Sequence, residues 1–351
     1  MQTRIPLFCL CLAWSLIGAA CAPHASNTRQ PAARTARSPT SVASVPTEAA
    51  PLASNEAVQD AGAPGSAALV ASARPACPEL PSIVDPGTPC GELRCLAFHT
   101  AAAAFAHVLA QQPRVIGVGE SHAQKGDESI PSATRRFAEL LLPSLCGRSR
   151  AMILEVWLPR NDCGDQRVKQ VAKAQKPVTA SQSKSNKDEY VALGYAAKRL
   201  GIDPSALVPT CDEYKSILDA GPDSIERMLT LISSKTADRV IEALHRTPAF
   251  EPGPEVIAYG GALHNDAEPT PEHQDFSYGP RLLAETQGRY IELDLIVREF
   301  VRDTDSWKNL PYYRALRSNS RQEGKTLLYQ WGEHSYALVF EKIGSTAEKG
   351  K

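Results

Sequence analysis

The stretch Arg114-Val115-Ile116-Gly117-Val118-Gly119-Glu120-Ser121-His122 decides the fold prediction. Its apolar run, Val115 to Val118, predicts a buried strand, and the apolar residues at helical spacing between Ser132 and Leu145 predict a helix after it. Alternating strands and helices indicate an α/β fold with a mostly parallel central sheet. In such sheets ligands bind beyond the carboxyl ends of the strands, which is where Glu120 and His122 would lie.

A similar arrangement recurs further along the chain. Val256 to Tyr259 is a second short apolar run, and the segment after it contains Gly260, Gly261, His264 and Asp266. If the two strands are parallel and close in one sheet, both histidines reach the same edge. One loop histidine is more often structural than functional, but two that follow glycines at equivalent strand ends favour a functional role.

A third apolar run, Ala151 to Trp157, carries the single carboxylate of Glu155. A carboxylate in such a run is costly to bury unless it pairs with another group or binds a ligand. Glu120 has an alternative role, because a carboxylate also favours the positive end of the next helix. The candidate site therefore consists of Glu120, His122, Glu155, His264 and Asp266.

The other patterns complete an α/β body in which helices flank the sheet, with a helical insertion and an edge hairpin. Further strands are predicted at Ser205–Val208 and Arg289–Val297, and a hairpin or pair of edge strands at Thr326–Tyr329 and Ser335–Phe340. Helices are predicted at Leu96–Gln111, Cys163–Lys173, Tyr190–Leu200, Pro222–His245 (one bent helix or two) and Arg281–Gln287. The polar Pro177–Lys187 predicts a surface loop or lid, and Ala267–Pro280 a long ordered loop.

Three more residues are candidates for substrate contact. Asp212 follows the predicted strand Ser205–Val208, although a role at the start of the next helix explains it equally well. Tyr259 ends the strand before His264, and Tyr278 lies in the long loop, where many side chains only face water.

Several common functions are disfavoured. Gly117-x-Gly119 lacks the third glycine of a dinucleotide-binding loop, and Glu120 would repel a pyrophosphate. No Gly-x-Ser-x-Gly, Walker or His-Glu-x-x-His motif is present. The formal net charge of -1 gives no electrostatic case for binding nucleic acid.

The amino-terminal sequence predicts export. Residues 1–20 combine Arg4, an apolar run and small residues, which is typical of a secretory signal peptide. Cys21 follows the small residues as in a bacterial lipobox, although Gly18 stands where Leu is more usual, so we expect it to carry a lipid that anchors the protein to the membrane of the cell envelope. The alternative is an ordinary signal peptide in which Cys21 has no such role. Ala22 after it resembles outer-membrane sorting. Residues 21–76 predict a disordered Ala/Pro/Ser/Thr-rich tether, residues 77–343 the folded domain and residues 344–351 a frayed tail.

Six cysteines belong to the predicted domain: Cys77, Cys90, Cys95, Cys146, Cys163 and Cys211. In an exported protein they predict up to three disulfides, whose pairing the sequence leaves open. A metal cluster is less favoured, because the spacing of Cys90 and Cys95 has no paired partner motif. A single catalytic cysteine is the remaining alternative.

Three features together resemble a known superfamily: Gly-Glu-x-His at 119–122, Leu-Glu at 154–155, and a late strand followed by Gly-x-x-x-His at 260–264. This superfamily groups erythromycin esterases, ChaN-type haem-uptake lipoproteins and Tiki-type metalloproteases, and the resemblance covers about Leu96 to Lys342. It implies a hydrolase of an ester or amide bond in a small molecule or peptide. It equally admits a ChaN-type lipoprotein that binds haem or a metal complex without catalysis, or an inactive relative.

The resemblance implies two hydrolytic mechanisms. In the metal-assisted one, His122 and His264 bind a divalent ion with a carboxylate from Glu120, Glu155 or Asp266. In the metal-free one, His122 is the general base, Glu120 or Glu155 orients it, and His264 helps to bind the oxyanion. For haem, axial ligands would come from Tyr259, Tyr278 or either histidine.

Overall fold

The computed structural model describes residues 77–78, 85–158, 163–246, 254–319, 322 and 324–343, which all belong to one compact unit. These residues form a nine-stranded sheet with the order β1-β2-β8-β9-β7-β3-β6-β4-β5. The strands are β1 (Thr88–Pro89), β2 (Leu96–Phe98), β3 (Val115–Glu120), β4 (Ala151–Trp157), β5 (Asp203–Leu207), β6 (Val256–Gly261), β7 (Tyr290–Ile296), β8 (Thr326–Gln330) and β9 (Ser335–Val339).

The sheet has a parallel and an antiparallel part. From β9 through β7, β3, β6 and β4 to β5 every neighbouring pair is parallel, whereas β1, β2, β8 and β9 pair antiparallel. The predicted α/β fold with a mostly parallel sheet is therefore confirmed. The β8–β9 pair lies inside the sheet, because β2 and β1 continue it outward from β8.

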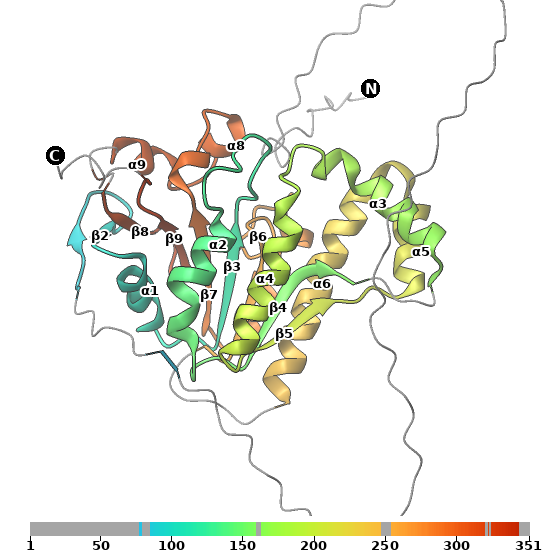
Figure 1. The fold of residues 1–351 in the computed structure, drawn as a ribbon, viewed down its shortest axis with the longest axis horizontal. Coiled ribbons are helices and arrows are strands. Elements are labelled where there is room, and N and C mark those ends of the chain that lie inside the picture. The colour runs from blue at the N-terminus through green and yellow to red at the C-terminus, as the bar shows by residue number, and fades with distance from the viewer. Residues whose placement is uncertain are drawn as a thin grey trace, which may run out of the picture. The chain divides into compact units, whose positions relative to one another are not determined.

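Helices cover both faces of the sheet (Figure 1). Those of the described residues are α1 (Ala101–Leu109), α2 (Ala133–Arg136), η1 (Phe137–Leu141), η2 (Leu142–Leu145), α3 (Asp165–Thr179), α4 (Ser185–Arg199), α5 (Cys211–Asp219), η4 (Gly221–Asp223), α6 (Ser224–His245), η5 (Gln274–Phe276), α7 (Gly279–Glu285), η6 (Arg298–Phe300), α8 (Asp305–Lys308) and α9 (Tyr313–Ser318). None of them is long and apolar enough to cross a membrane.

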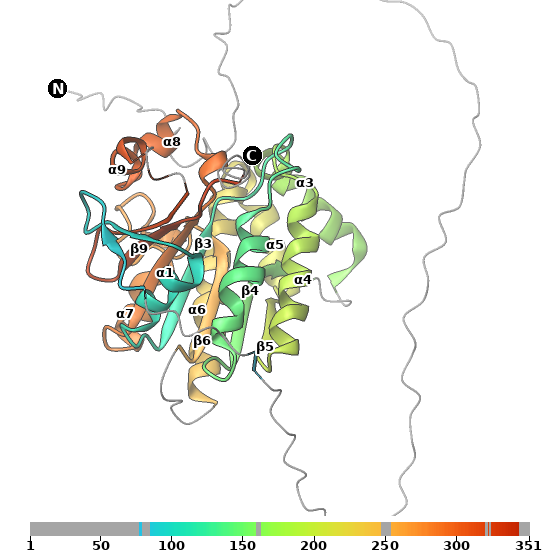
Figure 2. The same ribbon diagram turned by 60° about the vertical axis from the view of Figure 1, so that its left-hand side comes forward.

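Alternating side chains along each strand separate two apolar cores. Ile116 and Val118 of β3 pack with α1, η1 and α4 on one face. Val115 of the same strand packs with α6 and α7 on the other face. A third cluster joins α8 and α9 to the antiparallel strands. Figure 2 shows these two helices above β9.

Two predicted boundaries are wrong. Leu96–Phe98 belongs to strand β2 and not to a helix; α1 begins only after Thr100, whose hydroxyl caps it by accepting the Ala103 N–H at 3.1 Å. The surface loop predicted at Pro177–Lys187 is shorter, residues 180–184, because α3 runs to Thr179 and α4 starts at Ser185. The polar composition of this segment reflects exposed helix surface. Pro222–His245 contains one long helix, α6, which begins at Ser224.

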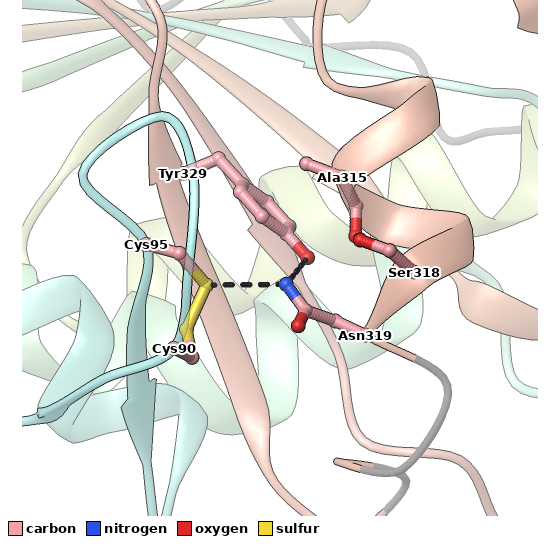
Figure 3. Close-up of a disulfide and its surroundings, with 6 residues drawn as sticks. All are labelled: Cys90, Cys95, Ala315, Ser318, Asn319 and Tyr329. Carbon is pink, nitrogen blue, oxygen red and sulfur yellow. Dashed lines mark hydrogen bonds between the residues drawn. A yellow bond between two sulfur atoms is a disulfide. The ribbon is translucent and has the colours of Figure 1, made fainter.

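Three disulfides confirm the cystine prediction and settle the pairing: Cys77–Cys146, Cys90–Cys95 and Cys163–Cys211. Figure 3 shows the Cys90–Cys95 bridge, where the Asn319 amide donates to Cys95 Sγ at 3.7 Å and to the Tyr329 hydroxyl at 3.0 Å. The predicted signal peptide and the whole predicted tether, with Cys21, lie outside the described residues, as does the predicted tail.

Candidate functional site

Strands β3 and β6 are parallel neighbours, which meets the condition for both histidines to reach one edge of the sheet. Gly119 pairs with Gly260 and Glu120 with Gly261, so the segments after β3 and β6 leave the sheet at the same level. The segments that contain His122 and His264 therefore start side by side at the carboxyl edge. We call this edge, with Glu120, His122, Glu155 and His264, the rim.

Glu120 is buried at the end of β3, with 3% of its surface exposed. Its Oε1 lies 2.9 Å from Nδ1 of His122, and its Oε2 accepts hydrogen bonds from the hydroxyls of Thr134 at 2.7 Å and Tyr259 at 3.3 Å. An ionised carboxylate can only accept, so Nδ1 of His122 carries the proton and Nε2 keeps its lone pair in the neutral ring. The hydroxyl of Tyr190 also lies close to this carboxylate, without meeting the geometry of a hydrogen bond.

The charges of Glu120 and His122 stabilise each other. Burial favours the neutral form of each, but the mutual hydrogen bond and charge outweigh it. As a result the pKa of Glu120 lies below its usual range and the pKa of His122 above its usual range. The pair is thus an ionised carboxylate that orients a basic imidazole, as in sites of general-base catalysis.

Glu155 and His264 form the second half of the rim. Oε2 of Glu155 accepts the Gly261 N–H at 2.7 Å, and its Oε1 lies 3.7 Å from Nε2 of His264. The other ring nitrogen of His264, Nδ1, lies 2.7 Å from the carbonyl oxygen of Phe276. A carbonyl only accepts, so Nδ1 carries a proton there and Nε2 is directed to the rim.

Gly261 leaves a small space between the two halves. A Cβ atom at this position would lie 3.6 Å from Nε2 of His122 and 3.7 Å from Oε2 of Glu155. The imidazole nitrogen and the carboxylate therefore face the same point beside the backbone. A water molecule or a scissile group there would contact both.

The segment that contains His264 is held in place by hydrogen bonds from residues outside the predicted candidate site. Asn265 is fully buried, and its amide donates at 3.1 Å to both the Gly117 carbonyl and Oδ1 of Asp294. The Tyr290 hydroxyl donates to the Asn265 carbonyl. Burial raises the pKa of Asp294 to about 7. Asp294 could have been identified from the sequence, because it is a carboxylate at a buried position of the predicted strand Arg289–Val297.

Four other predicted site residues do not join the rim as open ligand groups. Asp266 is half-buried and accepts the Glu268 N–H at 3.0 Å; burial raises its pKa. Tyr259 and Tyr278 are 2% exposed each, so they pack beneath the surface. Asp212 is exposed in the first turn of α5, where Thr210 and Glu213 form the capping box.

Within the described residues, no group of three or more His, Cys, Asp or Glu side chains is arranged to hold a metal ion. A hollow of about 350 Å³ lies elsewhere, between α1 and the antiparallel strands, and is lined by residues that include Arg94, His107 and Tyr336.

Comparisons with known proteins assign no family to the chain. No family model matches the chain, and no curated protein matches it. Among solved structures, the type III effector HopBA1 aligns with 69% of this chain and 91% of its own, at 14% identity and a TM-score of 0.32. A likeness at that TM-score supports no inference about this chain.

Proposed function

We propose that the protein is a hydrolase of ester or amide bonds in which His122 is the general base. The observation that carries this proposal is the buried Glu120 carboxylate 2.9 Å from Nδ1 of His122. A buried carboxylate that holds Nδ1–H leaves Nε2 as the proton acceptor and stabilises the imidazolium that forms. The side chain of His122 is 25% exposed, so solvent and substrate can reach the ring.

The reaction would proceed by direct attack of water. Nε2 of His122 removes a proton from the water as its oxygen adds to the carbonyl carbon, and Glu120 stabilises the resulting imidazolium. His264, when protonated, donates from Nε2 to the oxyanion that forms. His122 then returns its proton to the leaving alcohol or amine, and the ring is neutral again.

Glu155 would set the geometry of the second half of the site. It accepts the Gly261 N–H and lies 3.7 Å from His264, so it fixes the backbone on which the reacting carbonyl would sit. It also faces the same space as Nε2 of His122. This places it to accept a hydrogen bond from the attacking water.

A metal-assisted version uses the same residues. The Nε2 atoms of both histidines and the Glu155 carboxylate would have to move closer together to serve as ligands, because the described residues contain no group of three such side chains arranged to hold a metal ion. A divalent ion bound there would lower the pKa of water and polarise the carbonyl. Asp266 would not be a ligand in this arrangement, because its carboxylate bonds to its own loop. Elemental analysis of protein purified without chelator, compared with the His122→Ala/His264→Ala variant, distinguishes the two versions. A Soret band after addition of haem would instead favour the haem-binding alternative.

The decisive experiment measures hydrolysis of 4-nitrophenyl esters and fluorogenic peptides by the domain from Cys77 onward. We expect His122→Ala to lower kcat/KM by roughly 10²- to 10⁴-fold. The matched control is His245→Ala, because His245 is exposed at the end of α6 and also pairs with a glutamate, Glu285, at 2.9 Å. Equal activity of the His122 variant and the wild type would refute the general-base role.

We also propose that the chain is exported and anchored through Cys21. The three disulfides support this, because such bonds persist mainly in oxidising compartments. Metabolic labelling with a palmitate analogue tests the anchor. We expect label on the wild type and none on Cys21→Ser.

A further inference from the structure

Between their first acidic residues, helix α3 and the start of α4 carry only positively charged side chains. Between Asp165 and Asp188 the chain contains no acidic residue and six basic ones: Arg167, Lys169, Lys173, Lys176, Lys184 and Lys187. This density differs from the rest of a chain whose formal net charge is -1. Like charges so close together repel one another and lower the stability of the fold. A binding role for these side chains would explain why they are grouped, and this role depends on where they lie relative to the rim.

Three of these lysines form a stripe on α3. Lys169, Lys173 and Lys176 follow one another at spacings of four and three, which places them on the same face of a helix. All three are exposed, and within the described residues none of them forms an ion pair. The stripe is therefore an open cationic surface.

The start of α4 adds two more exposed lysines, Lys184 at the N-cap position and Lys187 in the first turn. The amino-terminal end of a helix carries a partial positive charge, so cations there are unfavourable. The dipole of α4 therefore does not favour these two lysines. A negatively charged ligand beside them would give a reason for their position.

The cationic segment is bonded to the chain that leaves the rim. Ser183 N–H donates to the Ala123 carbonyl at 2.8 Å, and the Asn186 amide donates to the same oxygen at 3.1 Å. Lys125 N–H donates to the Ser181 carbonyl at 2.9 Å. Ala123 directly follows His122, so the turn between α3 and α4 is a direct neighbour of the proposed general base.

From this juxtaposition we infer that the substrate is anionic, and that the lysines of α3 and α4 bind its negative group while the scissile bond lies at His122. The inference rests on the proposed function and adds the substrate class. Glu155 at the reacting position disfavours a negative charge there, so the charged group must lie away from the bond that is cleaved. The segment after β6, which contains Asp266, Glu268, Glu272 and Asp275, is acidic and would disfavour the same negative group.

Two ester probes of equal length test the substrate class: neutral 4-nitrophenyl octanoate and anionic 4-nitrophenyl hydrogen suberate. We expect the wild type to prefer the anionic ester, and Lys169→Gln/Lys173→Gln/Lys176→Gln to reduce that preference on the order of tenfold at low salt. The control Arg148→Gln/Lys198→Gln/Arg199→Gln removes three exposed cations at the opposite edge of the sheet and should keep the preference. Thermal melting of both variants shows that they fold.

Each outcome decides one of the two proposals. Hydrolysis of both esters with no anionic preference, or with a preference that the α3 variant retains, overturns the substrate class and leaves the hydrolase standing. If neither ester is hydrolysed, carbethoxylation of His122 by diethyl pyrocarbonate is followed by mass spectrometry with and without a hexaglutamate peptide. Protection in the wild type that is lost in the α3 variant supports the anionic ligand, and equal reactivity in both contradicts it.

Discussion

Nδ1 of His122 lies 2.9 Å from Oε1 of Glu120, two residues earlier on the same strand end. The carboxylate is 3% exposed and is also bonded by Thr134 and Tyr259, so its position is fixed from both oxygens. The hydrogen bond to this fixed carboxylate also fixes the orientation of the His122 imidazole. The base of the proposed reaction is therefore positioned by the sheet and not by a mobile loop.

Glu120→Gln should change the pH dependence as well as the rate. Burial lowers the pKa of His122, and the hydrogen bond and charge of Glu120 raise it above its usual range. A general base works when neutral, so kcat/KM rises with pH through this pKa. Removing the charge lowers the pKa, and the rising limb should move to lower pH while the maximum falls by roughly 10²-fold or more.

NMR titration of the His122 ring measures the same shift without a substrate. Glu128→Gln, at an exposed position after the rim, is the control and should leave the titration unchanged. An unaltered His122 titration in Glu120→Gln would contradict the coupling of the pair.

Gly119→Ala should destabilise the fold, whereas Gly261→Ala should leave the fold intact and lower the activity. At Gly119 a Cβ would lie 2.4 Å from Oδ1 of Asn265 and 2.7 Å from the Ala262 backbone, so we expect a loss of about 1–3 kcal/mol in the free energy of unfolding. At Gly261 the nearest atoms are 3.6 Å away, which is ordinary contact.

The Gly261→Ala variant should therefore fold normally but fill the space between His122 and Glu155. Urea unfolding and ester hydrolysis, measured together, check both expectations. Normal activity in a well-folded Gly261→Ala protein would show that the substrate does not use this space.

Asp294→Asn should stabilise the protein more at high pH than at low pH. Burial raises the pKa of Asp294 to about 7, and burial with the charge of Asp294 raises that of Glu292 well above its usual range. Above about pH 4 the unfolded chain releases the Asp294 proton while the folded protein keeps it, so stability falls as the pH rises toward 7. The asparagine removes this loss.

The measurement is Tm at pH 5 and pH 8 for the wild type, Asp294→Asn and the exposed control Asp212→Asn. The difference in Tm between Asp294→Asn and the wild type should increase with pH. A constant difference would mean that Asp294 is ionised throughout.

Removal of two of the three disulfides, Cys163–Cys211 and Cys90–Cys95, should cost different amounts. Cys163–Cys211 spans 48 residues and Cys90–Cys95 only 5, and a longer closed loop constrains the unfolded chain more. Replacing both cysteines with alanine should cost about 4 kcal/mol for the first pair and about 2 kcal/mol for the second. Urea unfolding of the two double variants measures this, and a larger loss for Cys90–Cys95 would indicate that its contacts with Asn319 matter more than loop closure.

Strands β3, β4 and β6 of the parallel part were predictable because each contains a short apolar run. Ala151–Trp157 was predicted with the observed ends, and β3 and β6 extend the predicted runs by two residues each. The Leu96–Phe98 strand was missed because three residues before an Ala-rich helix carry no periodicity of their own. The length of α3 was missed because its surface is polar and contains Pro177.

The site was predictable where chemistry follows a strand directly. Glu120, His122, Glu155 and His264 meet the expectation that their strand ends are adjacent, since β6 lies between β3 and β4. Asn265 and Thr134 were not selected, because an amide in a loop and a hydroxyl in a helix occur everywhere in sequences. Only the fold shows that they bond to Asp294 and Glu120.

The parallel register of β3 between β6 and β7 makes the rim sensitive to insertions and deletions. Successive residues of a strand point to opposite faces, so one residue inserted into Val115–Glu120 would turn the Glu120 position from the α4 side of the sheet to the α6 side. An insertion before Gly119 would put Gly119 at that position, so the hydroxyls of Thr134 and Tyr259 would lose the carboxylate that accepts their hydrogen bonds. Substitutions can tune this site by degrees, whereas a change of one residue in the length of β3 abolishes it.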